Sequence, residues 1–361
     1  MPELHFPPAG TWTRADASDL GFNAGALRAA VRHAKDHESP WPVDVGGMVA
    51  KDDPPPFNRP IGPTRPRGPA TGLVVKDGLI VAEWGEPGRV DMTFSATKSY
   101  VSTCVGLALD RGLIGDVDEP VCHRVADGFA GEHNELVTWR HLLHQTSEWS
   151  GTLFGIPDTV DHNRSAADAP ARKGIPRPLQ QPGTFWEYND VRVNALALAA
   201  LRIWREPLPD VLAREVMQPI GASSGWRWEA YDNATVSIDG RDMASVPGGG
   251  HWGGGLMIDS FDHARFGLLW LAQGQWNGRR ILQPSWIQAA LAACPQNDRY
   301  GFMWWLNPVQ SVWPNASEGA FAAIGAGGNV VFVAPERGLV IVTRWAANPN
   351  NVIDRVLAAL Q

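Results

Sequence analysis

Two apolar runs joined by a short turn occur once early and once late in the chain. Residues 71–75 and 79–84 are apolar and flank the sequence Lys-Asp-Gly, and residues 329–335 and 339–345 flank Glu-Arg-Gly in the same way. Short apolar runs around such a turn are typical of β-hairpins. We therefore expect two strand pairs that come from distant parts of the chain.

Helical spacing dominates between the hairpins. Residues 94–114 place Val101, Val105 and Leu109 on one helical face, with Gly112 near the end. We expect further helices in 138–146, 190–204, 209–220, 261–274 and 352–360. The many prolines of residues 52–69 preclude a regular helix or a central strand and predict a surface loop.

Strands at both ends with helices between them predict an α+β fold. One antiparallel sheet is assembled from N- and C-terminal segments and flanked by helices, with a mainly helical region inserted. We expect an N-terminal extension with a helix and a proline-rich loop in 1–70, a sheet domain from 71–112 and 241–361, and a helical domain in 113–240. With 361 residues, 44% of them hydrophobic, the chain can bury a sizeable core.

Net charge and hydropathy limit the binding partners and the cellular compartment that we expect for this protein. A net charge of −7 without a basic block argues against nucleic acid, and no run of about eighteen apolar residues indicates a membrane span. Residues 1–10 lack the layout of a signal peptide, so we expect a cytoplasmic protein, or a periplasmic or secreted one if a leader has been removed. The oligomeric state stays open.

No metal or cofactor is predicted. Three cysteines lie far apart without a CxxC pair, and ten histidines show no HExxH or comparable spacing.

Chemistry is suggested by the stretch FSATKSY, residues 94–100. The chain uses twenty-six arginines but five lysines, yet Lys98 stands three positions after Ser95, so the two side chains share a helical face. A serine becomes a nucleophile when a base takes its proton, and a lysine can do so only when neutral, whereas arginine stays charged. Burial and the positive end of the helix dipole are expected to keep Lys98 neutral.

A second serine, Ser223, lies in a G-x-S-x-G match at residues 221–225. That motif marks a nucleophile when it joins a strand to a helix, but here it follows a helical segment and a proline. We interpret it as a turn.

Six ordered segments carry a family resemblance. They are FSATKSY with LALDRGLIGDVDEPV, TWRHLLHQTSEW, PGTFWEYNDVRVNALAL, GGGLMIDSFDHARFGLL and IGAGGNVVFVAPERGLVIV. Together, over roughly residues 71–347, the chain resembles the serine β-lactamase and penicillin-binding-protein superfamily. It is most similar to the class C-like branch, which includes esterases with a β-lactamase fold and nylon-oligomer hydrolases.

The resemblance assigns a Tyr-x-Asn element to Tyr188, which would share the proton network with Ser95 and Lys98. Tyr100 is the local rival, but its position on the helix turns it away from Ser95. The third position of the motif is Asp190 instead of asparagine. A carboxylate near Lys98 favours its charged form, so either Asp190 points elsewhere or Tyr188 carries more of the base role.

The family's Lys-Thr-Gly strand corresponds here to Ala323-Ile324-Gly325, so only the glycine is kept. The resemblance implies that the backbone N–H groups of Ser95 and Ala326 bind the oxyanion and that Gly325 lets substrate approach. Arg344 is the cation best placed to replace the missing lysine. Three more residues are expected at the substrate: Asp190, and His251 and Trp252, which lie between two glycine runs and could line the cleft. We interpret His144 as a structural histidine outside the site.

The function implied is a serine hydrolase that acts through an acyl-enzyme on small carboxylic esters, without a cofactor. Three alternatives stay open: hydrolysis of amides of the nylon-oligomer or D-peptide type, weak β-lactamase activity, and a sensor that is acylated without turnover.

Overall fold

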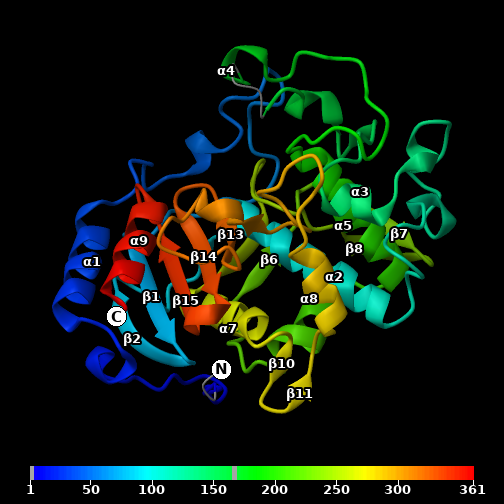
Figure 1. Cartoon of the computed structure of the whole chain (residues 1–361). Helices are drawn as coiled ribbons and strands as arrows, with labels where there is room; N and C mark the ends of the chain where they lie inside the picture. The colour runs from blue at the N-terminus through cyan, green and yellow to red at the C-terminus, as the bar shows by residue number, and fades with distance from the viewer. Residues whose placement is uncertain (1–3, 165–168) are drawn as a thin grey trace.

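The computed structural model describes residues 4–164 and 169–361, and its centre is one antiparallel sheet (Figure 1). The strands follow the order β12 (Trp305–Leu306), β13 (Phe321–Gly325), β14 (Asn329–Ala334), β15 (Leu339–Arg344), β1 (Thr71–Lys76) and β2 (Leu79–Trp84). Thr71 of β1 lies opposite Arg344 of β15, so the early and the late hairpin join edge to edge. The expected α+β architecture, with a sheet built from both ends of the chain, is confirmed.

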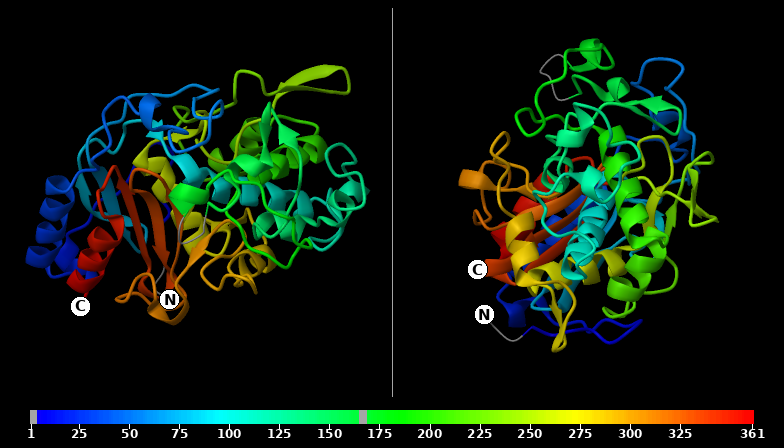
Figure 2. Two further views of the ribbon diagram at one scale, coloured as in Figure 1. Left: turned by 90° about the horizontal axis from the view of Figure 1, so that it is seen from above. Right: turned by 90° about the vertical axis from the view of Figure 1, so that its right-hand side faces the viewer.

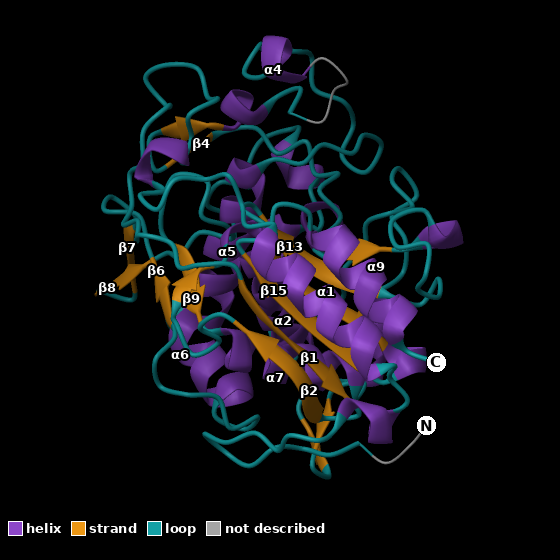
Figure 3. Ribbon diagram, turned by 90° about the vertical axis from the view of Figure 1, so that its left-hand side faces the viewer, coloured by secondary structure: helices purple, strands orange, loops and turns teal. Residues whose placement is uncertain are grey.

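Helices cover both faces of the sheet because its strands are buried on both sides. On one face α1 (Ala24–Asp36) and α9 (Pro349–Ala359) pack together over an apolar cluster, and Figure 3 views them in front of the strands. On the other face lie α7 (Ser260–Leu271) and α2 (Thr97–Asp110). Helix α2 is buried from Thr97 to Ala108, because the inserted region packs against its far side.

The inserted region lies beyond α2, away from α1 and α9 (Figure 2). Its helices are α3 (Trp139–Leu143), α4 (Ala169–Arg172), α5 (Asp190–Trp204) and α6 (Leu208–Leu212). The single helix expected over 209–220 is α6 followed by a π-helical turn, Ala213–Met217. A short hairpin, β4 (Thr152–Leu153) with β5 (Ile156–Pro157), occurs here too. A second one, β7 (Thr235–Ile238) with β8 (Arg241–Ala244), crosses the boundary expected at residue 240.

A small second sheet links the inserted region to the main sheet domain. Strand β9 (Gly255–Ile258) pairs with β3 (Asp91–Met92) on one side and with β6 (Arg227–Glu229) on the other. Strand β6 therefore lies within the region 113–240 that was expected to be mainly helical, yet it pairs with β9, a strand that follows the glycine run. The remaining elements are β10 (Gln275–Trp276), β11 (Arg279–Arg280) and α8 (Pro284–Ala290).

Polar caps fix where the helices begin. The Asn189 side chain accepts hydrogen bonds from the N–H groups of Val191 and Arg192 and starts α5, and Asp259 does the same for α7 through Asp262. The start of α5 places Asp190 at its first position. Across the described residues, none of the helices has the length and apolar character needed to cross a membrane.

Candidate active site

Ser95 lies in a tight 3₁₀ turn, Phe94–Ala96, between β3 and α2. Phe94 has φ of 49°, a left-handed conformation that is unusual for an aromatic residue and that clusters at functional sites. A side-chain hydrogen bond stabilises the turn, because the Thr97 hydroxyl donates to the Phe94 carbonyl at 2.6 Å. It is also pressed onto the end of β13, where a Cβ on Gly325 would lie 2.0 Å from the Thr93 carbonyl oxygen. Only glycine fits there.

Lys98 follows Ser95 by one helical turn, and its Nζ donates to the Ser95 hydroxyl at 3.0 Å. The same ammonium forms an ion pair with the carboxylate of Asp190 at the start of α5. The Lys98 and Asp190 side chains are 1% and 2% exposed, whereas Ser95 is partly exposed. The serine and the lysine are therefore brought together as expected, and Asp190 points at them.

The charge state of Lys98 differs from the expectation. Burial lowers the pKa of the Lys98 ammonium, but the Asp190 carboxylate and Tyr188 together outweigh burial and raise that pKa above its ordinary value. Burial likewise raises the pKa of Asp190, yet Lys98 and Arg164 hold it well below its usual range. Burial and the helix dipole therefore do not keep Lys98 neutral. Of the two alternatives that the sequence left open, Asp190 pointing elsewhere is wrong, because Asp190 binds Lys98, and a larger share of the base role for Tyr188 stays a prediction.

The ring of Tyr188 lies beside the two cations that bind Asp190. Its centre is 4.7 Å from Lys98 Nζ and 5.2 Å from the guanidinium carbon of Arg164. The ring also stacks on Trp305 at 6.0 Å. Buried contacts fix the backbone on both sides, because Glu187 Oε1 accepts from a backbone N–H of the 161–164 turn and the Asn189 N–H donates to a Gln145 side chain, each at 2.7 Å. Tyr188 is thus placed beside Lys98 by its neighbours in the sequence.

Asp190 belongs to a network of charged side chains that are mostly buried. Arg164 bridges Asp190 and Asp161, with 3.1 Å to Asp161. Lys173 pairs with Asp53 and lies 3.3 Å from Asp161. Among the described residues, three carboxylates are paired with three lysine or arginine cations; these are Asp53, Asp161, Asp190, Lys98, Arg164 and Lys173.

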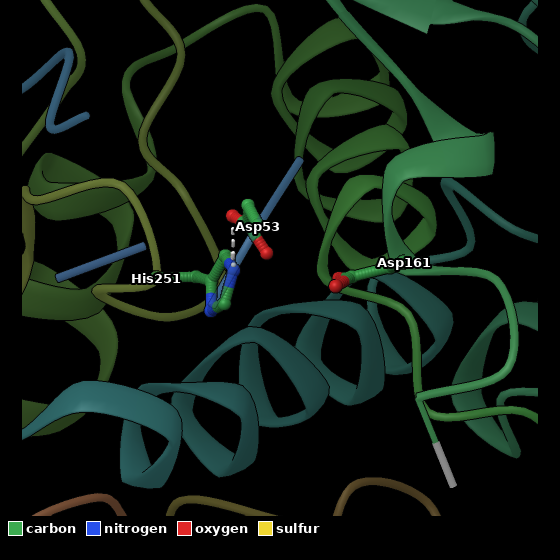
Figure 4. A group of neighbouring side chains, drawn as sticks. All are labelled: Asp53, Asp161 and His251. Carbon is green, nitrogen blue, oxygen red and sulfur yellow. Dashed lines mark hydrogen bonds and ion pairs between the residues drawn. The ribbon is translucent and has the colours of Figure 1, made fainter. Parts of the chain in front are cut away.

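His251 lies inside this network. Its Nε2 is 2.8 Å from Asp53 Oδ2, and its Nδ1 is 3.7 Å from Asp190 Oδ2. Figure 4 shows that His251, Asp53 and Asp161 come from three separate segments of the chain. One possible metal-ligand atom from each of them lies within 4.8 Å of the other two, so the three residues could hold a metal ion. The ammonium of Lys173 contacts all three groups and lies 3.4 Å from His251 Nε2. A metal ion would therefore have to displace Lys173.

The glycine run contributes through its backbone. A Cβ on Gly249 would lie 2.9 Å from Lys98 Nζ and 3.5 Å from Ser95 Oγ, so this glycine lets the loop touch the site. His251 lines a cavity of about 540 Å³ beside the serine turn, as expected for a cleft residue. Trp252 does not, because it is completely buried and donates its indole N–H to the Phe57 carbonyl. The expectation that Trp252 lines the cleft is wrong.

Strand β13 ends beside the serine turn. Strand β12 pairs only with Phe321 and Ala322, so the edge from Ala323 to Gly325 is open, and Ala326 beyond it is exposed on the cavity. The role of the Ala326 N–H as an oxyanion donor stays a prediction. Arg344 cannot replace the lost strand lysine, because its buried guanidinium binds Asn329 and three backbone carbonyls of the β3 and β9 strands.

The rival residues lie elsewhere. The Ser223 hydroxyl donates to Asp262 at 2.7 Å, a carboxylate that faces a separate cavity near the N-terminal segment. Tyr100 is buried and its hydroxyl lies 2.9 Å from His263 Nδ1. His144 packs on Phe302, and burial lowers its pKa to about 4, which fits a structural histidine.

Sequence reasoning missed Asp53, Asp161, Arg164, Lys173 and Gly249. The first four lie in loops or, for Asp161, at the end of a short 3₁₀ helix (Asp158–Asp161), where no periodicity marks a charged residue as buried. Gly249 was noticed only as part of a glycine run, although the small residue is required by its contact with Lys98.

Comparison with known proteins identifies the family and the fold of the chain. A family model described as Beta-lactamase matches residues 68–361, and no curated protein matches the chain. A penicillin-binding protein homologue from Caulobacter crescentus superposes with a TM-score of 0.61 at 17% identity, covering 96% of this chain and 98% of its own. EstCE1, a hydrolase with promiscuous acyltransferase activity, superposes with a TM-score of 0.60 at 14% identity, covering 93% of this chain and 98% of its own. A D-stereospecific amidohydrolase from Streptomyces sp. superposes with a TM-score of 0.57 at 18% identity, covering 92% of this chain and 98% of its own. At these identities the structural similarity establishes a shared fold.

Proposed function

The chain belongs to the beta-lactamase family, and from that premise we propose that it is a serine hydrolase that cleaves small carboxylic esters through an acyl-enzyme. The observation that carries the proposal is the contact of Lys98 Nζ with Ser95 Oγ at 3.0 Å in a strained turn that faces a cavity. A nucleophile within hydrogen-bond reach of its proton-transfer partner is the arrangement that covalent catalysis requires.

In the acylation step, Ser95 Oγ attacks the ester carbonyl carbon, and a C–O bond forms as the carbonyl oxygen becomes an oxyanion. Backbone N–H groups of Ser95 and Ala326 stabilise that oxyanion. Lys98 and Tyr188 relay the serine proton toward the leaving alcohol. When the tetrahedral intermediate collapses, the C–O bond to the alcohol breaks and the alcohol oxygen takes up the relayed proton. In deacylation, water attacks the acyl-enzyme carbonyl and gives a proton to the same pair, and Ser95 Oγ takes up that proton as its bond to the acyl group breaks.

Neutral esters fit the site better than β-lactams with their carboxylate. Ala323 and Ile324 stand where relatives that bind penicillins carry a cation and a hydroxyl, and Arg344 is fully engaged elsewhere. A hydrogen bond between charged groups contributes about 1.5–3 kcal/mol, which corresponds to one to two orders of magnitude in rate. We expect kcat/KM for p-nitrophenyl butyrate to exceed that for nitrocefin on the same preparation, and comparable values would contradict the ester assignment.

The test of the nucleophile is steady-state hydrolysis of p-nitrophenyl butyrate together with covalent labelling by a fluorophosphonate. Ser95→Ala should abolish both, and Ser223→Ala, the matched control, should keep both. A single burst without turnover would favour an acylated sensor over an enzyme. Equal damage from the two substitutions would show that Ser95 is not the nucleophile.

A further inference from the structure

The cavity beside the serine turn has one apolar wall. Trp41, Met48, Val49 and Ala50 from the N-terminal extension form it, and Phe94 continues it to the serine turn. A volume of about 540 Å³ lies within the range of small-molecule sites, about 300–1,000 Å³. The wall is therefore large enough to cover a substituent of several carbon atoms.

Contacts within this wall and with neighbouring segments hold it in place. The Trp41 ring meets the edge of Phe94 at 5.4 Å, and the Trp41 carbonyl accepts a hydrogen bond from Arg67 at 2.8 Å. Val49 and Ala50 are buried, and Asp53, three residues later, is tied to Lys173. A preformed wall binds a substituent without the cost of ordering a loop.

The wall adjoins the reacting centre. Phe94 directly precedes Ser95, and Ala326, which follows the open end of β13, lines the same cavity. A group that fills the cavity is thus attached close to the carbonyl that Ser95 attacks.

The polar residues that line the cavity are already paired. Arg164 is bound to Asp161 and Asp190, and Lys173 to Asp53 and Asp161. His251 lies 2.8 Å from Asp53, and Lys51 lies 3.0 Å from the Asp52 carboxylate. A carboxylate on the substrate would have to compete with these carboxylates for its counter-ion, whereas an uncharged group would not.

We propose that the cavity binds an uncharged apolar group of the ester, and that Trp41 and Met48 determine this specificity. The inference rests on the proposed hydrolase function and names its substrate class. Both residues precede the region that matches the family model, which begins at residue 68, so the wall is supplied by the extension. Each methylene buried on it should raise kcat/KM about fourfold until the cavity is filled.

The test compares kcat/KM in two ester series. One lengthens the acyl side, as p-nitrophenyl acetate, butyrate, hexanoate and octanoate, and the other lengthens the alcohol side, as ethyl, butyl and hexyl acetates. The series in which kcat/KM rises identifies the side of the ester that fills the cavity. Trp41→Ala and Met48→Ala should flatten that rise, so that the loss of kcat/KM relative to wild type grows with chain length. Leu136→Ala removes an exposed apolar side chain away from the cavity and should keep the rise.

A charged probe completes the test. The p-nitrophenyl monoester of adipic acid has the chain length of the hexanoate and a terminal carboxylate, and we expect at least a tenfold lower kcat/KM. Rates independent of chain length in both series, an unchanged rise in Trp41→Ala and Met48→Ala with native circular dichroism, or a preference for the adipate would each overturn the inference while the hydrolase function stands. Hydrolysis of no ester at all would overturn the proposed function and the inference with it.

Discussion

Asp190→Asn removes one charge from the site and keeps the shape of the side chain. In the native protein both oxygens of Asp190 are bound, one by Lys98 and the other by Arg164, and the Asp190 side chain is 2% exposed. The variant leaves the buried Lys98 ammonium without its carboxylate, whereas Arg164, which is 26% exposed, keeps Asp161. Asparagine also restores the residue that the family pattern has at this position.

The expected loss of stability is large. Breaking a buried ion pair by removing one partner costs about 3–5 kcal/mol. With an unfolding entropy of about 2.1 cal/mol/K per residue, a chain of 361 residues loses about 4–7 °C of Tm for that change. Asp118→Asn is the matched control, because Asp118 pairs with Arg140 where the two side chains are 60% and 36% exposed. Such a surface pair contributes about 0–1 kcal/mol, so the control should keep its Tm within about 1 °C.

The direction of the pKa shift of Asp190 determines how the stability difference between wild type and Asp190→Asn changes with pH. The pKa of Asp190 is depressed in the folded state, so its contribution is present above the unfolded pKa, about 3.9, and is lost as the pH falls toward the folded value. Thermal unfolding followed by circular dichroism should show the full gap between wild type and Asp190→Asn at pH 7 and a smaller gap below about pH 4. The limb of the kcat profile that reports the ionisation of Lys98 should also move to lower pH in Asp190→Asn, because Lys98 loses the carboxylate that raises its pKa. Equal Tm values at pH 7 would refute the buried ion pair.

Three further substitutions test the rest of the site. Lys98→Arg should reduce kcat for p-nitrophenyl butyrate about as much as Lys98→Ala, by about 10²–10⁴-fold, because a guanidinium does not release its proton; most activity retained would make Lys98 an electrostatic anchor only. Tyr188→Phe should slow acylation in single-turnover experiments by a similar factor, and an unchanged rate would assign the proton to another group. Gly325→Ala should lower Tm and slow fluorophosphonate labelling, because its Cβ would lie 2.0 Å from the Thr93 carbonyl oxygen, whereas Gly47→Ala, with open space around its Cβ, should change neither. Normal labelling of Gly325→Ala would show that the turn does not depend on this contact.

The sheet and the serine site were predictable because local patterns carry them. Apolar runs around a turn specify the β1–β2 and β14–β15 hairpins, and three-residue spacing on a helix brings Ser95 and Lys98 together. The family resemblance added Tyr188, whose ring lies beside Lys98. The pairing of β1 with β15 followed from the need to bury both hairpins in one sheet.

The charge network was not predictable in the same way. Asp53, Asp161 and Lys173 come from turns and from the end of a short 3₁₀ helix, and the sequence pattern does not determine how these segments meet. For the same reason Trp252 and Arg344 were assigned wrongly. A tryptophan between glycines has no pattern that distinguishes a buried ring from a cleft wall, and an arginine at a strand end has none that shows whether backbone carbonyls already use its donors.

The pairing of β1 with β15 affects the order in which the protein folds. Contacts between residues far apart in sequence close large loops and form slowly. The turn that carries Ser95 rests on Gly325, at the end of a strand near the C-terminal side of the chain, so it gains its support only after most of the polypeptide has been synthesised. Nascent chains that end before β13 should therefore carry Ser95 in a turn without this support and should fail to react with a fluorophosphonate, and the reactivity of the serine would report that the last part of the sheet has docked.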